Sequence, residues 1–350
     1  MDAPTLLEAA PAVLEALRSA VGADCIASGA AMEPKHFADH VVAQREGERP
    51  LAVAYPRSTG DVSAILRVCH AHNVAVVPQG GLTGLAGGAT PLDGCVALSL
   101  ARMRAIEEVD AAAATMTVQA GVPLQVIQEA ADAAGLLFPL DIGSRGSCLI
   151  GGNISTNAGG VHVLRYGMAR ELVLGIEVVL ADGTVMTSLN KMLKNNAGYD
   201  LKHLFIGSEG SLGVITRLVL RLFPRPDSVC TAVLALPDYA AVLELLARAR
   251  RKLGGTLAGF EVIWPEFYTL ATTEHGCRPP VPRGHGLYVL MESLGTDKQR
   301  DTVQFQEMIE GALEDGVVED AAIAQSLRES REMWGLRDSV IQFRQTFHPH

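Results

Sequence analysis

The spacing of apolar and polar positions along the chain predicts alternating helices and strands. Ser58 to Asp61 form a helix start of the capping-box kind, and apolar residues then follow at helical spacing as far as Cys69. The β-branched run 74–77 and the apolar run 95–100 each predict a short strand, and a glycine-rich stretch lies between them. This order of helix, strand, glycine loop and strand indicates an α+β arrangement.

The middle of the chain continues this mixed pattern. Alternation over 115–120 predicts a strand, and the helical stripe that follows it ends at Gly135. The runs 173–180 and 184–187 flank the sequence ADG, which is a strong signal for a β-hairpin.

The last third of the chain predicts a second unit. Pro224 and Pro226 indicate a linker. After it we expect a strand over 231–237, a helix over 239–253, two strands over 257–264 and 286–292, a helix over 297–314 and a short strand near 317–319. Their order, β-α-β-β-α-β, is that of the split βαβ or ferredoxin-like arrangement. One further helix is expected over 322–337, and no closing strand is expected after it.

Composition narrows the class of protein. Acidic residues outnumber basic ones by 39 to 29, and the formal charge of −10 argues against a nucleic-acid partner. Six cysteines without a CxxC pair indicate reduced thiols and a cytoplasmic location rather than a zinc or disulfide framework. No apolar run reaches the roughly 18 residues of a membrane helix, and the N-terminal residues suit an amphipathic helix better than a signal peptide.

Three glycine-rich segments carry the candidate chemistry. The first glycine segment is 78–88, the second is 141–160 and the third is 207–216. Glycines in the first segment free backbone N–H groups to form an anion nest, although a flexible surface loop explains a glycine loop alone equally well. This segment has neither the GxGxxG spacing of a Rossmann turn nor the GK[ST] of a Walker loop.

The second segment combines small side chains with short hydroxyl and amide groups. Backbone of this kind can lie against the face of a flat polar ring while Ser, Thr and Asn bond to its edge. A tight turn alone is a poor explanation for so long a stretch. The third segment joins a glycine loop to a β-branched strand and is only suggestive by itself.

Together these motifs resemble one enzyme family. Five stretches are similar to the FAD-linked 2-hydroxy-acid dehydrogenases of the vanillyl-alcohol-oxidase type: PQGGLTGLAGG, GSCLIGGNISTNAGG, LRYGMARELVLGIEVVLADGT, NNAGYDLKHLFIGSEGSLGVIT and WGLRD. That family includes D-lactate dehydrogenase, the flavin subunit of glycolate oxidase and D-2-hydroxyglutarate dehydrogenase. The likeness runs in order over residues 46–350.

The resemblance implies an α+β fold in three parts. A helical N-terminal segment would occupy 1–45, and a PCMH-type FAD-binding domain of two α+β subdomains would occupy 46–225. A ferredoxin-like cap domain for the substrate would occupy 226–350 and is expected to be incomplete at its C-terminal end.

The resemblance also implies which residues hold FAD. The pyrophosphate would lie in the first segment, against Pro78, Gly80, Gly81, Leu82, Thr83 and Gly84. The flavin would lie along the second segment, against Asp141, Ser144, Ser147, Cys148, Gly151, Gly152, Asn153, Thr156, Asn157 and Gly160. The rest of the cofactor would follow the third, against Glu209, Gly213, Val214 and Ile215.

Two features of these segments qualify the resemblance. Leu82 stands where many relatives have asparagine, so one side-chain bond to the pyrophosphate is expected to be lost while backbone contacts remain. The glycine segments contain no histidine of the kind that covalent members attach to flavin, so FAD is expected to be dissociable. Cys148 is expected to be a small buried packing residue rather than a reactive thiol.

Arg337 in WGLRD matches the arginine with which relatives hold the substrate carboxylate. A guanidinium fork binds a carboxylate bidentately and so fixes which face of the Cα–H bond meets the flavin. The alternative is a helix-surface arginine that pairs with Asp338 or Glu332.

The base that takes the hydroxyl proton is not found in the sequence. In relatives a C-terminal histidine beside a metal-binding His/Glu set has this role. Metal-ligand spacing is lacking at His70, His72, His162 and His203. His348 and His350 form an HxH pair, which is expected to be incidental because no third histidine or carboxylate lies nearby. No metal site is therefore expected, and a divalent metal such as zinc is expected only if a C-terminal segment is missing.

The sequence thus predicts oxidation of a D-2-hydroxy acid, of the D-lactate, glycolate or D-2-hydroxyglutarate class, to the 2-oxo acid. Electrons are expected to pass to electron-transfer flavoprotein or a quinone rather than to NAD, in the cytoplasm or at the periphery of the inner membrane. A homodimer is one candidate assembly. Two alternatives stay open: a flavin-holding accessory subunit without a substrate site, and a non-oxidising relative such as an alkyl-dihydroxyacetone-phosphate synthase.

Overall fold

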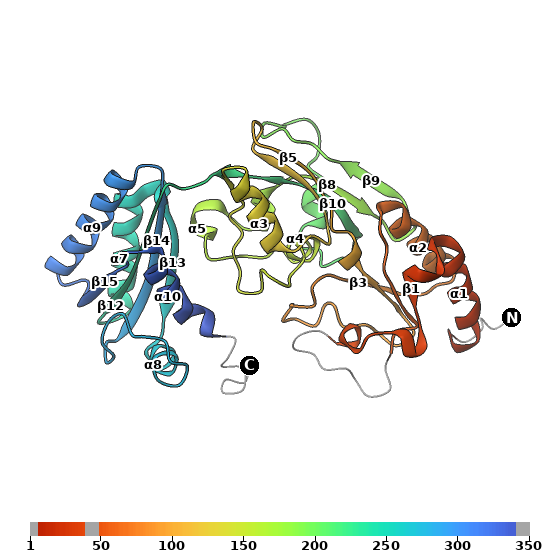
Figure 1. The fold of residues 1–350 in the computed structure, drawn as a ribbon, viewed down its shortest axis with the longest axis horizontal. Helices are drawn as coiled ribbons and strands as arrows, with labels where there is room; N and C mark the ends of the chain where they lie inside the picture. Colours follow the sequence, from red (N-terminus) through yellow and green to blue (C-terminus); the bar gives the residue numbers. More distant parts are fainter. Residues whose placement is uncertain (1–5, 39–48, 341–350) are drawn as a thin grey trace. The chain divides into compact units, whose positions relative to one another are not determined.

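A computed structural model describes residues 6–38 and 49–340 of the chain (Figure 1). His348 and His350 lie outside these residues. The chain divides into two compact units: unit 1 comprises Met1–Gly159 and Met168–Pro224, and unit 2 comprises Gly160–Gly167 and Arg225–His350. Both units mix helices and strands, which confirms the α+β class. The three domain ranges expected from the sequence stay predictions.

Unit 1 contains a four-stranded sheet in the order β1-β2-β4-β3. Its strands are β1 (Ile26–Ala27), β2 (Ala52–Ala54), β3 (Val76–Gln79) and β4 (Val96–Ser99), and the helices α1 (Leu6–Val21) and α2 (Thr59–Ala71) share its core. β2 and β3 run parallel to β4, whereas β1 runs antiparallel to β2. The capping pattern is confirmed, because the Ser58 hydroxyl accepts a hydrogen bond from the Asp61 N–H at 3.1 Å.

β3 differs from the strand expected over 74–77. It begins two residues later and includes Pro78 and Gln79. β3 is an edge strand of its sheet, where proline is tolerated because its missing N–H need not face a partner strand. The first glycine segment therefore starts inside the sheet and leaves it after Gln79.

A five-stranded antiparallel sheet in the order β5-β6-β10-β8-β9 forms the second part of unit 1. Its strands are β5 (Ile106–Asp110), β6 (Thr115–Gln119), β8 (Val173–Val179), β9 (Val185–Ser188) and β10 (Val214–Arg221). The expected hairpin is confirmed as β8-β9, with Gly183 at a φ of 84° in its turn.

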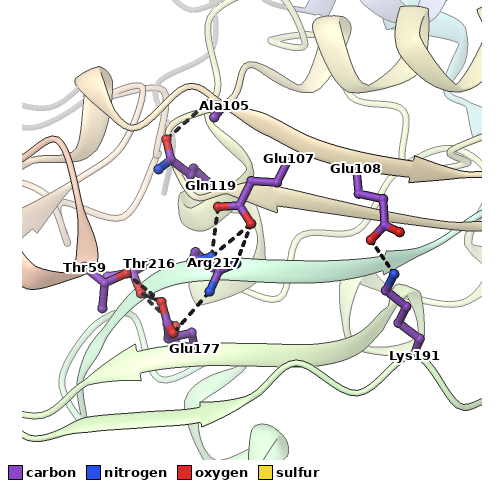
Figure 2. Close-up of polar contacts among 9 residues, drawn as sticks. All are labelled: Thr59, Ala105, Glu107, Glu108, Gln119, Glu177, Lys191, Thr216 and Arg217. Atoms are coloured by element: carbon purple, nitrogen blue, oxygen red, sulfur yellow. Dashed lines mark hydrogen bonds and ion pairs between the residues drawn. The ribbon is translucent and has the colours of Figure 1, made fainter.

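This sheet carries a buried glutamate on β8 (Figure 2). Glu177 accepts a hydrogen bond from the Thr59 hydroxyl of α2 at 2.6 Å and lies 3.4 Å from an Arg217 nitrogen of β10. Arg217 also donates to Glu107 of β5 at 2.9 Å. Charged side chains thus connect β5, β10 and β8, although β6 lies between β5 and β10 in the sheet.

The remaining elements of unit 1 are short. They are α3 (Leu124–Ala133), β7 (Leu136–Leu137), α4 (Ile150–Ser155), α6 (Lys202–Phe205) and β11 (Phe223–Pro224), with 3₁₀ turns at Ala23–Cys25, Gly29–Ala31, Pro34–Phe37, Leu100–Arg102 and Ala169–Leu172. β11 pairs with β7 in a two-stranded ribbon.

Unit 2 is built on a four-stranded antiparallel sheet in the order β13-β14-β12-β15. Its strands are β12 (Ser228–Leu236), β13 (Leu257–Ile263), β14 (Leu287–Gly295) and β15 (Asp320–Ile323), and its helices are α5 (Val163–Tyr166), α7 (Tyr239–Leu253), α8 (Pro265–Thr273), α9 (Lys298–Glu314) and α10 (Leu327–Asp338), with a 3₁₀ turn at Gly254–Thr256. This strand order is the ferredoxin-like one and confirms the prediction.

The two faces of this sheet are covered by different helices (Figure 1). α7 and α9 share one apolar core with alternate residues of β12 and β14. α8 and α10 share another core with the intervening residues of the same strands. The sheet is therefore buried on both faces, as its apolar runs suggest.

Three details of unit 2 correct the sequence prediction. The last strand is Asp320–Ile323 rather than 317–319, because Val317 and Val318 are core residues ahead of the strand. α10 begins at Leu327 rather than near 322, after the Ser326 hydroxyl caps its first turn. α8 was not expected; its sequence signal is a proline at the first helical position.

In the part of the chain that the structure describes, no helix combines the length and apolar content needed to cross a bilayer.

Candidate functional site

The first and second glycine segments meet backbone to backbone in unit 1. A Cβ at Gly81 would overlap the Ser147 carbonyl oxygen and lie 2.8 Å from the Cys148 Cα. A Cβ at Gly80 would lie 3.5 Å from the Gly152 Cα. Only glycine permits so close an approach at position 81.

The second and third segments are joined by backbone hydrogen bonds. The Glu209 N–H donates to the Ser155 carbonyl at 2.8 Å, and the Gly207 N–H donates to the Ile154 carbonyl at 3.2 Å. Glu209 adopts a φ of 54°, a left-handed conformation that is uncommon outside glycine. The turn at the start of the third segment is therefore held against α4.

The third segment also reaches the first. A Cβ at Gly210 would lie 3.0 Å from the Pro78 Cγ, and Gly210 has a φ of +80°. A cavity of about 450 Å³ is lined by Pro78 and residues 210–214 together with residues of α2, the stretch 73–76, and β8 with its turn; its lining includes no residue of the second segment. All three segments, far apart in sequence, thus contact one another.

The residues of these segments fit a flat polar cofactor. Asn153 is buried, and among the described residues its Oδ1 atom has no hydrogen-bond partner, which leaves an acceptor for a bound group. Burial raises the pKa of the Cys148 thiol, so that side chain is neutral. A cradle of backbone, small side chains and one amide oxygen without a partner matches the requirements of a flavin dinucleotide.

Leu82 has a backbone conformation that is uncommon for leucine. It adopts a φ of 57°, which asparagine tolerates better than leucine because a short polar side chain bonds locally. Beside it, Thr83 is half-buried and Gly84 is exposed, with nothing described near a Cβ at position 84.

The other expected cofactor residues are mostly engaged within unit 1. Asp141 pairs with Arg145 at 2.9 Å, the Ser147 hydroxyl donates to the Ser144 carbonyl at 3.2 Å, and the Thr156 hydroxyl donates to the Gly152 carbonyl at 3.0 Å. Gly151, Gly213, Val214 and Ile215 are buried in α4 and at the start of β10. Gly160 belongs to unit 2, so the structure does not group it with the rest.

Two residues that sequence reasoning missed brace these segments. The Arg170 guanidinium donates to the carbonyls of His203 at 3.0 Å and Ile206 at 2.6 Å, and the Arg170 N–H donates to the Asn157 side chain at 3.0 Å. Arg170 therefore ties the second segment to the start of the third. Its position in the family motif YGMAREL was the only available signal.

Gln79 braces the first segment from behind. Its amide N–H groups donate to the carbonyls of His36 and Ala89 at 3.0 and 2.9 Å, and its Oε1 lies 2.7 Å from His36 Nδ1. Because Gln79 Oε1 only accepts, His36 Nδ1 carries the proton and Nε2 does not. Burial lowers the pKa of His36 and keeps the ring neutral.

Arg337 lies near the end of α10 in unit 2 and is one-third exposed. Its guanidinium is 3.5 Å from carboxylates of both Glu261 and Asp338, longer than a charge-assisted hydrogen bond. The expected surface pairing with Asp338 is present, whereas Glu332 pairs with Arg328 instead. The guanidinium is thus near its partners without being locked to either.

Within residues 6–38 and 49–340, no group of three or more His, Cys, Asp or Glu side chains is arranged to hold a metal ion.

Two successive stretches of the chain match known protein families. Residues 50–188 match the FAD binding domain, and residues 225–348 match the C-terminal domain of FAD linked oxidases. The chain belongs to the FAD-linked oxidases, with a PCMH-type FAD-binding domain followed by the C-terminal oxidase domain.

Relatives of this kind share about two fifths of the aligned residues. D-2-hydroxyglutarate dehydrogenase of Bos taurus mitochondria is 42% identical over 82% of this chain and 53% of its own length. D-2-hydroxyglutarate dehydrogenase of Xanthomonas citri pv. viticola is 39% identical over 86% of this chain and 63% of its own. The chain therefore spans between about half and two thirds of each relative's length.

Solved structures agree on the fold. An alkyldihydroxyacetonephosphate synthase superposes with a TM-score of 0.77 at 18% identity. The match covers 96% of this chain and 64% of the synthase. A 4-ethylphenol oxidase from Gulosibacter chungangensis superposes with a TM-score of 0.72 at 20% identity. That match covers 95% of this chain and 69% of the oxidase. At these identities the likeness shows the fold alone.

Proposed function

We propose that this chain binds FAD and the substrate carboxylate in an enzyme that oxidises a D-2-hydroxy acid to the 2-oxo acid. The observation that carries this proposal is the meeting of the three glycine segments in unit 1, where the buried Asn153 Oδ1 has no hydrogen-bond partner among the described residues. The 39–42% identity to D-2-hydroxyglutarate dehydrogenases supports that substrate class.

Unit 1 supplies the cofactor site. The first segment offers backbone N–H groups to the pyrophosphate, and Asn153 with its neighbours offers polar contacts to the ring edge. FAD, when bound, supplies a hydride acceptor at its N5 atom. We propose that the cofactor is held without a covalent bond, because the glycine segments contain no histidine.

Unit 2 supplies a carboxylate clamp. Arg337 exchanges its two long contacts with Glu261 and Asp338 for a bidentate bond to the substrate carboxylate, which orients the Cα–H bond. No described residue is assigned as the base for the hydroxyl proton. Electron-transfer flavoprotein or a quinone is the proposed acceptor, the cytoplasm the proposed location and a homodimer a proposed assembly.

Replacement of Arg337 tests this assignment. In Arg337→Ala, kcat/KM for D-2-hydroxyglutarate, measured with an artificial electron acceptor, falls by the equivalent of about 2 kcal/mol or more while bound flavin is retained. Arg328→Ala is the matched control, since Arg328 lies on the same helix and its side chain is 81% exposed. Equal kinetics in the two variants would overturn the clamp.

The same assay separates the alternatives. A protein that retains FAD but reduces no acceptor with D-2-hydroxyglutarate, D-lactate or glycolate is an accessory subunit or a non-oxidising relative rather than a dehydrogenase.

A further inference from the structure

A buried glutamate in unit 2 binds three other side chains. Glu292 on β14 is only 5% exposed. Its Oε2 accepts hydrogen bonds from the Trp334 indole N–H at 2.7 Å and the Thr231 hydroxyl at 3.0 Å. Its Oε1 lies 3.0 Å from His162 Nε2. As a carboxylate, Glu292 accepts all three bonds.

This network continues to a second point on α10. The hydroxyls of Thr231 and Ser330 lie 2.8 Å apart. Because Thr231 gives its only proton to Glu292, Ser330 must donate to Thr231. α10 is therefore held to the sheet at Ser330, through Thr231, and at Trp334, directly by Glu292.

Both held residues share a face of α10 with Arg337. Positions 330, 334 and 337 have the i, i+4, i+7 spacing that places side chains in one row on a helix. The Trp334 ring lies over Gly259 of β13, where a Cβ would come within 3.2 Å of it. Glu261, two residues along β13, pairs with Arg337. The network thus holds in place the face of α10 that carries Arg337.

An ionisable side chain at position 292 is not required for packing. Tyr288 and Leu290 precede it on the same face of β14 and belong to the apolar core under α8 and α10. Burying a carboxylate carries a desolvation penalty, and apolar residues of similar volume are often as stable in such places. The carboxylate instead fixes the orientation of α10, because its hydrogen bonds specify one rotation of the helix about its axis and apolar contacts do not.

We propose that Glu292 is a positioning residue for Arg337. Its bonds to Trp334 and Thr231 set the rotation of α10 about its axis. One residue of helical rotation is about 100°, so that setting decides where the guanidinium meets the substrate carboxylate. The inference rests on the proposed role of Arg337 and adds a residue that never touches substrate.

Through its bond to His162, Glu292 also holds a second segment of unit 2. His162 and α5 belong to the excursion of unit 2 at Gly160–Gly167, which begins at the last residue of the second glycine segment. Arg165 in this excursion donates to the Leu294 carbonyl, so β14 holds the excursion at two points. One carboxylate therefore joins α10 and the excursion to the same strand.

The test uses FAD-loaded protein and D-2-hydroxyglutarate as the probe. In Glu292→Leu, KM rises by about tenfold while bound flavin is retained, because both bonds to α10 are lost. Glu292→Gln stays within about threefold of the parent, since its carbonyl oxygen still accepts from Trp334 and Thr231. Val289→Ala is the control: Val289 is buried on the opposite face of β14, so it lowers stability without raising KM.

A second variant covers the case in which Glu292→Leu does not fold. Trp334→Phe keeps a ring over Gly259, loses the bond to Glu292 and raises KM by several fold, about three or more. The chain has two tryptophans, so the indole N–H resonance of Trp334 can be assigned with Trp264→Phe. We expect it to be slow to exchange with solvent in the parent and in Glu292→Gln, and fast in Glu292→Leu.

A double-mutant comparison decides the role. If Glu292 acts through Arg337, Glu292→Leu has no further effect on KM in an Arg337→Ala background. A full, additive effect in that background overturns the inference, as does a KM in Glu292→Leu or Trp334→Phe equal to that in Val289→Ala. If Arg337→Ala alone leaves kcat/KM unchanged, the proposed clamp fails and the inference falls with it. If only the Glu292 and Trp334 variants are silent, the clamp stands.

Discussion

The candidate site of unit 1 is formed by backbone groups, whereas that of unit 2 is formed by side chains. Unit 1 uses backbone: Gly81 touches the second segment where no side chain fits, and Glu209 and Gly207 bond through their N–H groups. Unit 2 uses side chains: the row of α10 that contains Arg337 is held by a buried carboxylate, an indole and two hydroxyls. One site depends on the absence of side chains and the other on their exact pairing.

This difference follows from what each site is proposed to bind. A dinucleotide is large and presents phosphate oxygens and a flat ring, so many backbone N–H groups serve it at little cost in side-chain entropy. A small carboxylate makes few contacts, so a single guanidinium must be aimed correctly. Substitutions in unit 1 should therefore act through added volume, and those in unit 2 through lost hydrogen bonds.

The largest expected effect is at Gly81. Gly81→Ala places a methyl group on the Ser147 carbonyl and separates the first two segments, which costs about 3 kcal/mol in stability or abolishes flavin retention. Gly60→Ala is the matched control in unit 1, because Gly60 lies outside the three glycine segments and a Cβ there would meet only the Ser58 Oγ, at 3.5 Å. Equal flavin content in both purified variants would show that close approach of the segments does not matter.

A smaller loss of stability is expected when each of the two buried glutamates is replaced by glutamine. Glu177→Gln in unit 1 removes the charge beside Arg217 and lowers the free energy of unfolding by about 1 kcal/mol, since Arg217 keeps only Glu107. Glu292→Gln should cost less, because the partners of Glu292 among the described residues are the Trp334 indole, the Thr231 hydroxyl and the His162 ring. Urea unfolding of the two variants measures both, and a larger loss in Glu292→Gln would contradict the account of its partners.

The smallest effect concerns pH and His36 behind the first segment. Burial lowers the pKa of His36, so the folded protein binds its proton less readily than the unfolded chain. The stability from neutral His36 is complete above the ordinary value of about 6.5 and declines as pH falls below it. His36→Asn keeps a donor for Gln79 and removes the titration, so the loss of melting temperature between about pH 7 and pH 5 shrinks. An unchanged loss would assign the acid sensitivity elsewhere.

The sequence contained most of the fold and the cofactor segments because their signals are local. The helix cap at Ser58, the hairpin around Gly183 and the ferredoxin-like order of unit 2 are all set by residues close in the chain. The glycine segments were recognisable for the same reason. Their mutual contact was predicted only through the resemblance.

What the sequence did not reveal depends on distant pairings. Glu292 and His162 are 130 residues apart, and each is unremarkable in its own segment. Arg170 had been one residue of a long motif, and its bonds to His203 and Ile206 exist only once the chain has folded. α8 was missed because its N-cap is Trp264, whose side chain makes no capping bond.

The central claim is that the three glycine segments form one site for FAD, and equilibrium titration of the flavin-free protein with FAD tests it most directly. The account predicts saturable binding that perturbs the flavin absorbance, weakens in Gly81→Ala but not in Gly60→Ala, and is reversed by denaturation with release of intact FAD. A parent protein that stays colourless in excess FAD would contradict it.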